Sequence, residues 1–289
     1  MEKLLLLITA TQIIFESLPV SSSGHVLLTS ILAKKFWQNQ EFYFWDILDP
    51  LLHITALIAI TLTFYRDWMP LFNKLLQAVT RPFAKQKLTY SQQKLLFIFL
   101  KILGLIFLAD LATSFFYFFF KNLFKNSLIS QSPQILLFGF CCTTLILISL
   151  FIKQNAFSAK PKPLNLKKAL ILGIIQGLAF VPGISRFAST YVTGCWLNLG
   201  TRRAFQISFL LHLPLIVADS LFHGIVPIFK NTTLLSIFSK NFIFIALFST
   251  IITTLLLMFI YKLALKGRLW LFSFYMIIPI TLLIVILNN

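Results

Sequence analysis

Charged residues are scarce in this chain, and acidic residues are the scarcest of them. Only 11% of the 289 residues are charged, and eight Asp and Glu stand against 25 Lys and Arg. Soluble domains carry roughly 25% charged residues, so this composition excludes an ordinary soluble protein. The three cysteines, Cys141, Cys142 and Cys195, lie in apolar stretches without metal-ligand spacing, which argues against a disulfide framework or a cysteine metal site.

Apolar side chains dominate instead. Hydrophobic residues make up 58% of the sequence, 33 of them Phe, and several stretches reach the roughly 20 residues that a membrane-spanning helix needs. We therefore expect an all-α integral membrane protein that forms a single membrane domain over residues 1–289. Lys3 is the only basic residue before the first apolar run, and this run leads directly into a polar segment. We therefore expect no cleaved signal peptide.

The formal net charge of +17 would suggest a nucleic-acid partner in a soluble protein. Here the basic residues stand mainly in loops between apolar stretches, which is the pattern of a membrane protein with positive cytoplasmic loops. We expect the bilayer, and no nucleic acid, to be the partner of these charges.

Two polar segments interrupt the apolar sequence, QIIFESLPVSSSGH at 12–25 and QGLAFVPGISRFAST at 176–190. Both contain hydroxyls, Pro and Gly between flanks of Leu, Ile and Phe. Lipid cannot satisfy the hydrogen bonds of irregular backbone, so such segments occur at membrane depth only where protein buries them or water reaches them. We expect each segment to form the turn of a helical hairpin and part of a functional site.

Six uninterrupted apolar segments are long enough to span a bilayer. They lie at about 43–65, 95–119, 134–152, 205–227, 241–261 and 269–287. The regions 3–33 and 169–199 are apolar but broken by the polar segments, so each is expected to form a re-entrant pair of short helices. This order, a hairpin and three spans repeated once, predicts an inverted-topology repeat with halves 1–152 and 153–289.

The distribution of Lys and Arg supports this order. Seven lie in segments assigned to the outside, whereas 16 lie in the loops assigned to the inside, at 66–94, 153–168, 200–204 and 262–268. Lys34 and Lys35 are on the outer side and count against the assignment. In an inverted pair the two hairpin turns face each other near the middle of the bilayer, so both polar segments are expected to form one site.

Glu16 is the strongest candidate in the first segment, because a carboxylate inside an apolar helix is costly and marks a functional or paired position. Gln12 lies one helical turn earlier, so both side chains project from one face. Two oxygen ligands placed in this way can hold a hard divalent cation such as Mg²⁺ or Ca²⁺. The alternative is that Glu16 only pairs with Arg186 or caps backbone amides.

The residues PVSSSGH place three hydroxyls and an imidazole directly after a helix-breaking proline. Ser21, Ser22 and Ser23 can bind an anion together with exposed backbone amides. Ser22 or a neighbour can attack phosphorus, with His25 as general base or as the acid for the leaving group. Each serine can instead be a helix cap, and His25 can be structural.

The second segment supplies a guanidinium group. Arg186 is the only Arg deep in an apolar region, and its shape matches bidentate recognition of phosphate. Ser185 and Thr190 add hydroxyl donors, and Gly183 permits close approach of the backbone, so we expect these residues to bind substrate. The alternative is an Arg side chain that extends to the membrane interface.

Other polar residues inside apolar stretches are weaker candidates. For these we favour hydrogen bonds between packed helices over a direct role in the site. They are His53, Asp46, Asp110, His212, Asp219 and His223.

The two polar segments resemble the motifs of the bacterial undecaprenyl-diphosphate phosphatase family, known as BacA or UppP. That family carries an (E/Q)xxxE motif followed by residues like PVSSSGH, and a second motif, PGxSRSxxT. Here the first motif runs from Gln12 to Glu16 and continues into PVSSSGH, and the second reads PGISRFAST at 182–190. Further resemblance at 44–67 and 204–218 extends the similarity over essentially the whole chain.

The resemblance implies hydrolysis of undecaprenyl diphosphate to undecaprenyl phosphate and inorganic phosphate, which recycles the lipid carrier for peptidoglycan and other envelope polymers. It implies a multi-pass protein of the bacterial plasma (inner) membrane, an outward-facing site, a divalent cation, a polyprenyl diphosphate partner and a link to bacitracin resistance. Gln12 and Glu16 would be the residues of the acidic motif. Ser22 and His25 would belong to the catalytic group, and Arg186 would bind the diphosphate. Whether the chain is a monomer or a homodimer stays open.

Two positions depart from the family pattern, and two other classes of protein share part of it. Phe187 stands where the family usually has Ser, and His212 stands where it more often has a small residue. Type 2 phosphatidic acid phosphatases also have SGH and SR, but they need a His where this chain has Val192. A polyprenyl-lipid transporter or flippase without hydrolysis shares the broken helices. The acid, imidazole, hydroxyls and guanidinium together favour hydrolysis.

Overall fold

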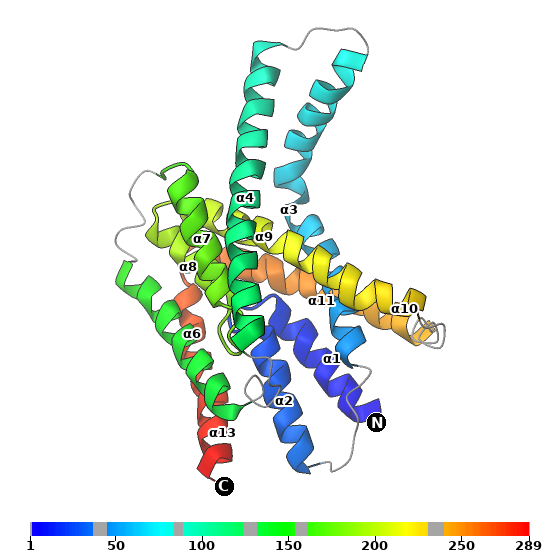
Figure 1. The fold of residues 1–289 in the computed structure, drawn as a ribbon, viewed down its shortest axis with the longest axis vertical. Coiled ribbons are helices and arrows are strands. Elements are labelled where there is room, and N and C mark those ends of the chain that lie inside the picture. The colour runs from blue at the N-terminus through cyan, green and yellow to red at the C-terminus, as the bar shows by residue number, and fades with distance from the viewer. Residues whose placement is uncertain are drawn as a thin grey trace.

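The expected all-α class is confirmed by a computed structural model of the chain. It describes residues 2–36, 45–83, 89–123, 132–153, 161–230 and 240–288, and these ranges contain helices and connecting turns but no strand. Figure 1 shows the helices gathered in one bundle, with both chain ends toward the same end of the molecule.

The first polar segment forms the turn of a helical hairpin. Helix α1 (Glu2–Glu16) and helix α2 (Ser22–Phe36) have 15 residues each, which at 1.5 Å per residue is about 22 Å and too short for a bilayer core of roughly 30 Å. Ser21 precedes α2 with φ 69°, in the left-handed region that non-glycine residues avoid. Its Oγ accepts a hydrogen bond from the Gly24 amide (3.2 Å), so it caps the helix.

The second polar segment forms a similar turn. Helices α7 (Leu166–Leu178) and α8 (Arg186–Trp196) have 13 and 11 residues, so these are also too short to cross. Asn165 caps α7 and Ser185 caps α8, each through its side-chain oxygen. Gly183 has φ 89° in the turn between them.

Longer helices follow each hairpin. After the first come α3 (Trp45–Phe83), α4 (Tyr90–Leu123) and α6 (Pro133–Lys153). After the second, α9 (Thr201–Asp219) continues through a π-helical segment, η2 (Ser220–Ile225), into α10 (Val226–Lys230). The chain then forms α11 (Lys240–Leu265), a short 3₁₀ turn η4 (Leu269–Leu271), α12 (Phe272–Tyr275) and α13 (Ile277–Asn288).

Five of the six predicted spans coincide with helices that are long and apolar enough to cross a membrane. Within the described residues these candidates are 90–120, 133–153, 201–230, 244–265 and 269–288. The sixth expected span, 43–65, lies mostly in α3, which is not among these five.

The expected loop at 66–94 is wrong for most of its length, because α3 continues to Phe83 and α4 begins at Tyr90. Hydropathy shows where a helix stops being apolar, and the helix itself can continue further. In Figure 1 the outer parts of α3 and α4 extend beyond the other helices.

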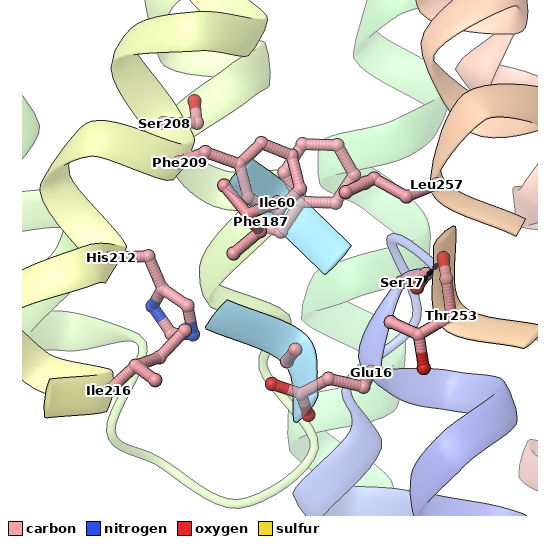
Figure 2. A pocket seen from close by; sticks show the side chains of 11 residues that line it. Glu16, Ser17, Ile60, Phe187, Ser208, Phe209, His212, Ile216, Thr253 and Leu257 are labelled. Carbon is pink, nitrogen blue, oxygen red and sulfur yellow. Dashed lines mark hydrogen bonds between the residues drawn. The ribbon is translucent and has the colours of Figure 1, made fainter. Parts of the chain in front are cut away.

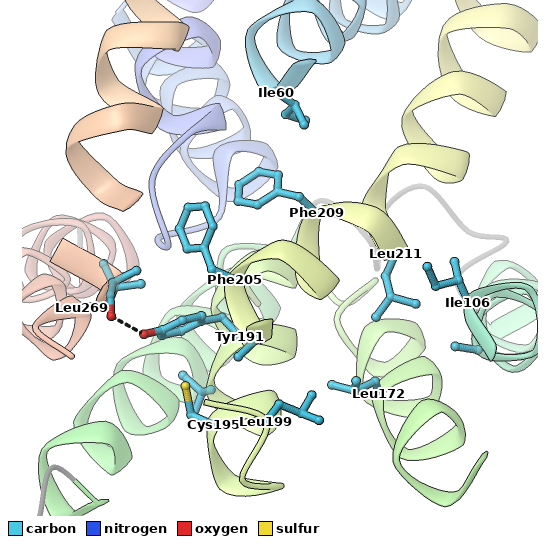
Figure 3. Packing of buried hydrophobic residues seen from close by; sticks show 14 of the residues in the cluster. Ile60, Ile106, Leu172, Tyr191, Cys195, Leu199, Phe205, Phe209, Leu211 and Leu269 are labelled. Atoms are coloured by element: carbon cyan, nitrogen blue, oxygen red, sulfur yellow. Dashed lines mark hydrogen bonds between the residues drawn. The ribbon is translucent and has the colours of Figure 1, made fainter. Parts of the chain in front are cut away.

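Apolar packing holds the second hairpin against the long helices. Tyr191 on α8 is fully buried among Phe205 and Phe209 of α9, and its hydroxyl donates a hydrogen bond to the Ala264 carbonyl of α11 (2.9 Å). Figure 3 shows this cluster continuing through Leu211 toward α4 and α7. The cluster fixes α8, and with it Arg186 at its first turn.

The turns of the two hairpins touch each other. A Cβ atom added to Gly24 would lie 2.9 Å from the Gly183 Cα and 2.8 Å from the Phe140 ring of α6. Thr143, also on α6, donates a hydrogen bond to the Gly183 carbonyl (2.7 Å) and accepts one from the Ser185 amide (3.0 Å). The expectation that segments 12–25 and 176–190 meet is therefore confirmed.

Replacing Gly24 by Ala is expected to destabilise this contact. The new methyl group must displace backbone or a buried ring, and such overpacking costs about 1–3 kcal/mol. Thermal unfolding of the purified protein in detergent measures the effect. Gly104 on α4 has no atom within 4 Å of an added Cβ, so Gly104→Ala controls for the higher helix propensity of Ala. An equal thermal midpoint for both variants would contradict the close contact.

Candidate active site

Glu16, at the end of α1, is the centre of a hydrogen-bonded cluster. Its Oε2 accepts hydrogen bonds from Gln12 Nε2 (2.9 Å) and from Ser22 Oγ (3.0 Å). Its Oε1 lies 3.1 Å from His53 Nδ1 on α3. The predicted common face of Gln12 and Glu16 is confirmed, and the turn brings Ser22 to the same carboxylate.

Glu16 pairs with His53, and among the described residues it forms no ion pair with Arg186. This excludes the pairing with Arg186 as the reason for a carboxylate at this position. His53 Nε2 also lies 3.6 Å from Asp219 Oδ2 and 3.9 Å from Asp49 Oδ2. An imidazole that is hydrogen-bonded to Glu16 and close to two further carboxylates can fix the orientation of Glu16.

His25 has a different environment from the one expected. Its Nδ1 lies 2.8 Å from the Ser21 carbonyl, its Nε2 lies 3.0 Å from Tyr275 Oη, and its ring stacks on Phe15 with centroids 4.0 Å apart. Both nitrogens are thus occupied, and neither is bonded to Ser22. The structure instead gives Ser22 the Glu16 carboxylate as its partner, and a catalytic role for His25 stays a prediction.

Most of the other expected hydroxyls bind backbone. Ser21 and Ser185 cap α2 and α8, which supports the alternative of simple helix capping for both. Thr190 Oγ1 donates to the Arg186 carbonyl (2.9 Å) within α8. Ser23 is exposed and Ser22 is half-buried. Ser22 is therefore the hydroxyl of this group that is hydrogen-bonded to an acid.

Arg186 lies at the start of α8, directly after the second turn. Its side chain is half-buried, with the guanidinium carbon 5.5 Å from the centre of the Phe180 ring. No described residue forms a hydrogen bond or ion pair with the guanidinium, although its charge interacts at longer range with Asp49 and His212. An Arg fork without a partner is ready to bind an anion.

A cavity with an empty volume of about 380 Å³ adjoins Glu16 (Figure 2). Glu16 and His212 line its polar end, and Phe187 and Phe209 contribute to its apolar walls. Phe187 packs on Phe209 with ring centroids 4.9 Å apart. The ring that replaces the expected hydroxyl beside Arg186 therefore belongs to an apolar wall.

Gln12 and Glu16 are the expected ligands of a divalent cation. The described residues contain no group of three or more His, Cys, Asp or Glu arranged around one metal ion. Gln12 directs its amide nitrogen at Glu16, and its Oε1 is buried without a hydrogen-bond partner. Buried polar atoms are rarely left unpaired, so this oxygen is suited to a ligand. The hard oxygen donors fit Mg²⁺ or Ca²⁺ if the substrate and water supply the remaining ligands.

Three residues of this region are not predicted as parts of the site by the sequence motifs. For His53 and His212 the sequence favours packing hydrogen bonds, and Tyr275 lies outside both motifs. The available signal was a histidine inside an apolar span, which by itself is costly and marks a function.

Comparison with known proteins agrees with the motifs. The undecaprenyl-diphosphatase of Borrelia hermsii is 30% identical over 276 residues, which cover 93% of this chain and 92% of that protein. The undecaprenyl-diphosphatases of Borrelia recurrentis (29% over 269 residues; 93% and 92%) and Treponema denticola (28% over 281 residues; 94% and 92%) are similar over the same extent. The family described as bacitracin resistance protein BacA matches residues 5–281. The chain belongs to the BacA family.

Proposed function

We propose that the protein is a membrane phosphatase that hydrolyses undecaprenyl diphosphate to undecaprenyl phosphate and inorganic phosphate, and so recycles the lipid carrier of cell-envelope synthesis. The relatives above carry the name of this activity. The observation that carries the proposal is Ser22 hydrogen-bonded to Glu16 at one hairpin turn, with the unpaired Arg186 at the other. A hydroxyl, a base and an anion-binding fork are what phosphoryl transfer needs.

Arg186 binds oxygens of the diphosphate and lowers the charge on the group being transferred. Gln12 and Glu16 would hold a divalent cation, and the buried Gln12 Oε1 supports this role. A cation bound there would supply positive charge to offset that of the phosphate. His53 orients Glu16 through the 3.1 Å contact.

In the reaction, the oxygen of Ser22, or a water in its place, attacks the terminal phosphorus as Glu16 takes its proton. The bond from this phosphorus to the bridging oxygen breaks, and undecaprenyl phosphate leaves with the electron pair. Where Ser22 attacks, a water then hydrolyses the phosphoserine, releases inorganic phosphate and returns the proton to the serine. Glu16 passes its proton to the departing phosphate or to water, so one water is consumed in total.

We further propose that the chain has six spans and two re-entrant hairpins, related as inverted repeats 1–152 and 153–289, in the bacterial plasma membrane with the site facing outward. The order of a hairpin and long helices, which occurs twice, supports this arrangement. Both termini lie toward one end of the molecule (Figure 1), which agrees with an odd number of crossings in each half.

Purified protein is expected to release inorganic phosphate from a polyprenyl diphosphate, and a chelator is expected to reduce the rate at least about 100-fold. Adding back Mg²⁺ or Ca²⁺ should restore it. A polyprenyl monophosphate serves as the control and should release none. Binding of the diphosphate without release of phosphate would overturn the proposal and favour a transporter. A rate that chelation leaves unchanged would contradict the proposed requirement for a divalent cation.

A further inference from the structure

His212 reaches the cavity beside Glu16 and takes no part in the steps above. It projects from α9, and Figure 2 shows its imidazole and the Glu16 carboxylate on opposite sides of the cavity. Its interactions with described residues are electrostatic, with Arg186, Glu16 and His53, and include no hydrogen bond. An imidazole carries at least one N–H donor in either protonation state. A half-buried donor that faces a cavity is stabilised by a ligand that accepts its hydrogen bond.

The neighbours of His212 on its helix face are apolar. Phe209 precedes it by three residues and Ile216 follows it by four, so all three project from one side of α9. All three line the cavity. Ser208 of α9 also lines the cavity, but its hydroxyl donates to the Ala204 carbonyl within the helix. His212 therefore lies between two hydrophobic side chains, which suits a ligand with a phosphate attached directly to a hydrocarbon chain.

The position of the nucleophile decides which phosphate lies near His212. Ser22 and Glu16 must be next to the terminal phosphorus, because the bond to the attacking oxygen forms there. His212 faces Glu16 across the cavity, between Phe209 and Ile216 of its own helix. The phosphate attached to the lipid is the part of the substrate that joins a charged group to an apolar chain.

We propose that His212 donates a hydrogen bond to the phosphate that stays on the lipid, and so selects phosphate groups that carry an isoprenoid chain. The inference rests on the proposed function, and it names a binding role for a residue outside both sequence motifs. Because the undecaprenyl phosphate product keeps this contact, His212 also sets how strongly the product is held.

The test uses the purified full-length protein and three probes: farnesyl phosphate, farnesol and inorganic phosphate. Direct binding is measured by isothermal calorimetry. His212→Ala is expected to weaken the binding of farnesyl phosphate about tenfold, because it removes one hydrogen bond to a charged group. The affinities for farnesol and inorganic phosphate should not change. His212→Asn, which keeps an N–H donor, should recover part of the loss.

Arg203→Ala is the control, because Arg203 lies on α9 as His212 does but is exposed and does not line the cavity. It should bind all three probes as the wild type does. Unchanged farnesyl phosphate binding in His212→Ala would overturn the inference. An equal loss for farnesol would also overturn it, since it would indicate a change in packing. Wild-type protein that binds farnesyl phosphate but releases no phosphate from the diphosphate would contradict the proposed function and leave this test valid.

Discussion

Arg186→Ala is expected to reduce phosphate release from a polyprenyl diphosphate by about 10³-fold, because removing one preorganised electrostatic contact to a reacting group costs 10²–10³ in rate. The guanidinium has no described hydrogen-bond or ion-pair partner that its loss would leave unsatisfied. The fold should therefore survive, and equal thermal midpoints would show it. Initial rates of phosphate release measure the effect.

Arg203→Ala is the control for this substitution. Arg203 is also at the first turn of a helix, α9, but it is exposed. Its removal should leave the rate within about twofold. Arg186→Lys keeps the charge but loses the planar fork, so its rate should fall between those of the wild type and Arg186→Ala. If Arg186→Ala kept more than about a tenth of the wild-type rate, the guanidinium would not bind the reacting group.

Glu16→Gln is expected to reduce the rate of phosphate release at least about 10³-fold. It removes both the base for Ser22 and the negatively charged ligand for the cation. The substitution keeps the size of the side chain. It changes the hydrogen bonds with Gln12, Ser22 and His53 from charged to neutral. Phosphate release measured over a range of Mg²⁺ concentrations separates the two causes. A rate restored at high Mg²⁺ indicates weak cation binding, and a low rate at every concentration indicates loss of the base.

Asp110→Asn offers a matched exchange of carboxylate for amide in another apolar helix. Asp110 lies on α4 and accepts a weak hydrogen bond from Gln176 (3.5 Å), which Asn can also accept. Asp110 does not line the cavity, so Asp110→Asn should release phosphate at the rate of the wild type. Full activity in Glu16→Gln, or an equal loss in Asp110→Asn, would rule out a specific role for Glu16.

The local features of the site could be predicted from the sequence because they depend on helical geometry and on helix-breaking residues. Gln12 and Glu16 are four residues apart, so their common face follows from helical geometry. The pairing of Ser22 with Glu16 was not predicted, because the sequence favoured His25 as the base for Ser22. The meeting of the two turns followed from the repeated order of hairpin and spans, and the contact of Gly24 with Gly183 confirms it.

The partners supplied by other helices could not be predicted in the same way. His53 contacts Glu16 from 37 residues away, and Tyr275 reaches His25 across 250 residues. Such contacts depend on how each helix is rotated about its own axis, which is decided by packing over its whole length. The predicted end of α3 is wrong for a different reason, since a helix can continue beyond its apolar part where its residues favour the helix.

The contact of the two glycines also has a consequence for biosynthesis. More than 150 residues separate Gly24 from Gly183, so the ribosome completes the first hairpin long before the second exists. During that interval Glu16 already has its partners Gln12, Ser22 and His53, but Gly24 lacks the backbone of the second hairpin that packs against it. A polypeptide truncated before α7 would leave the first hairpin without this packing partner, so we expect limited proteolysis to cleave it faster than the full chain.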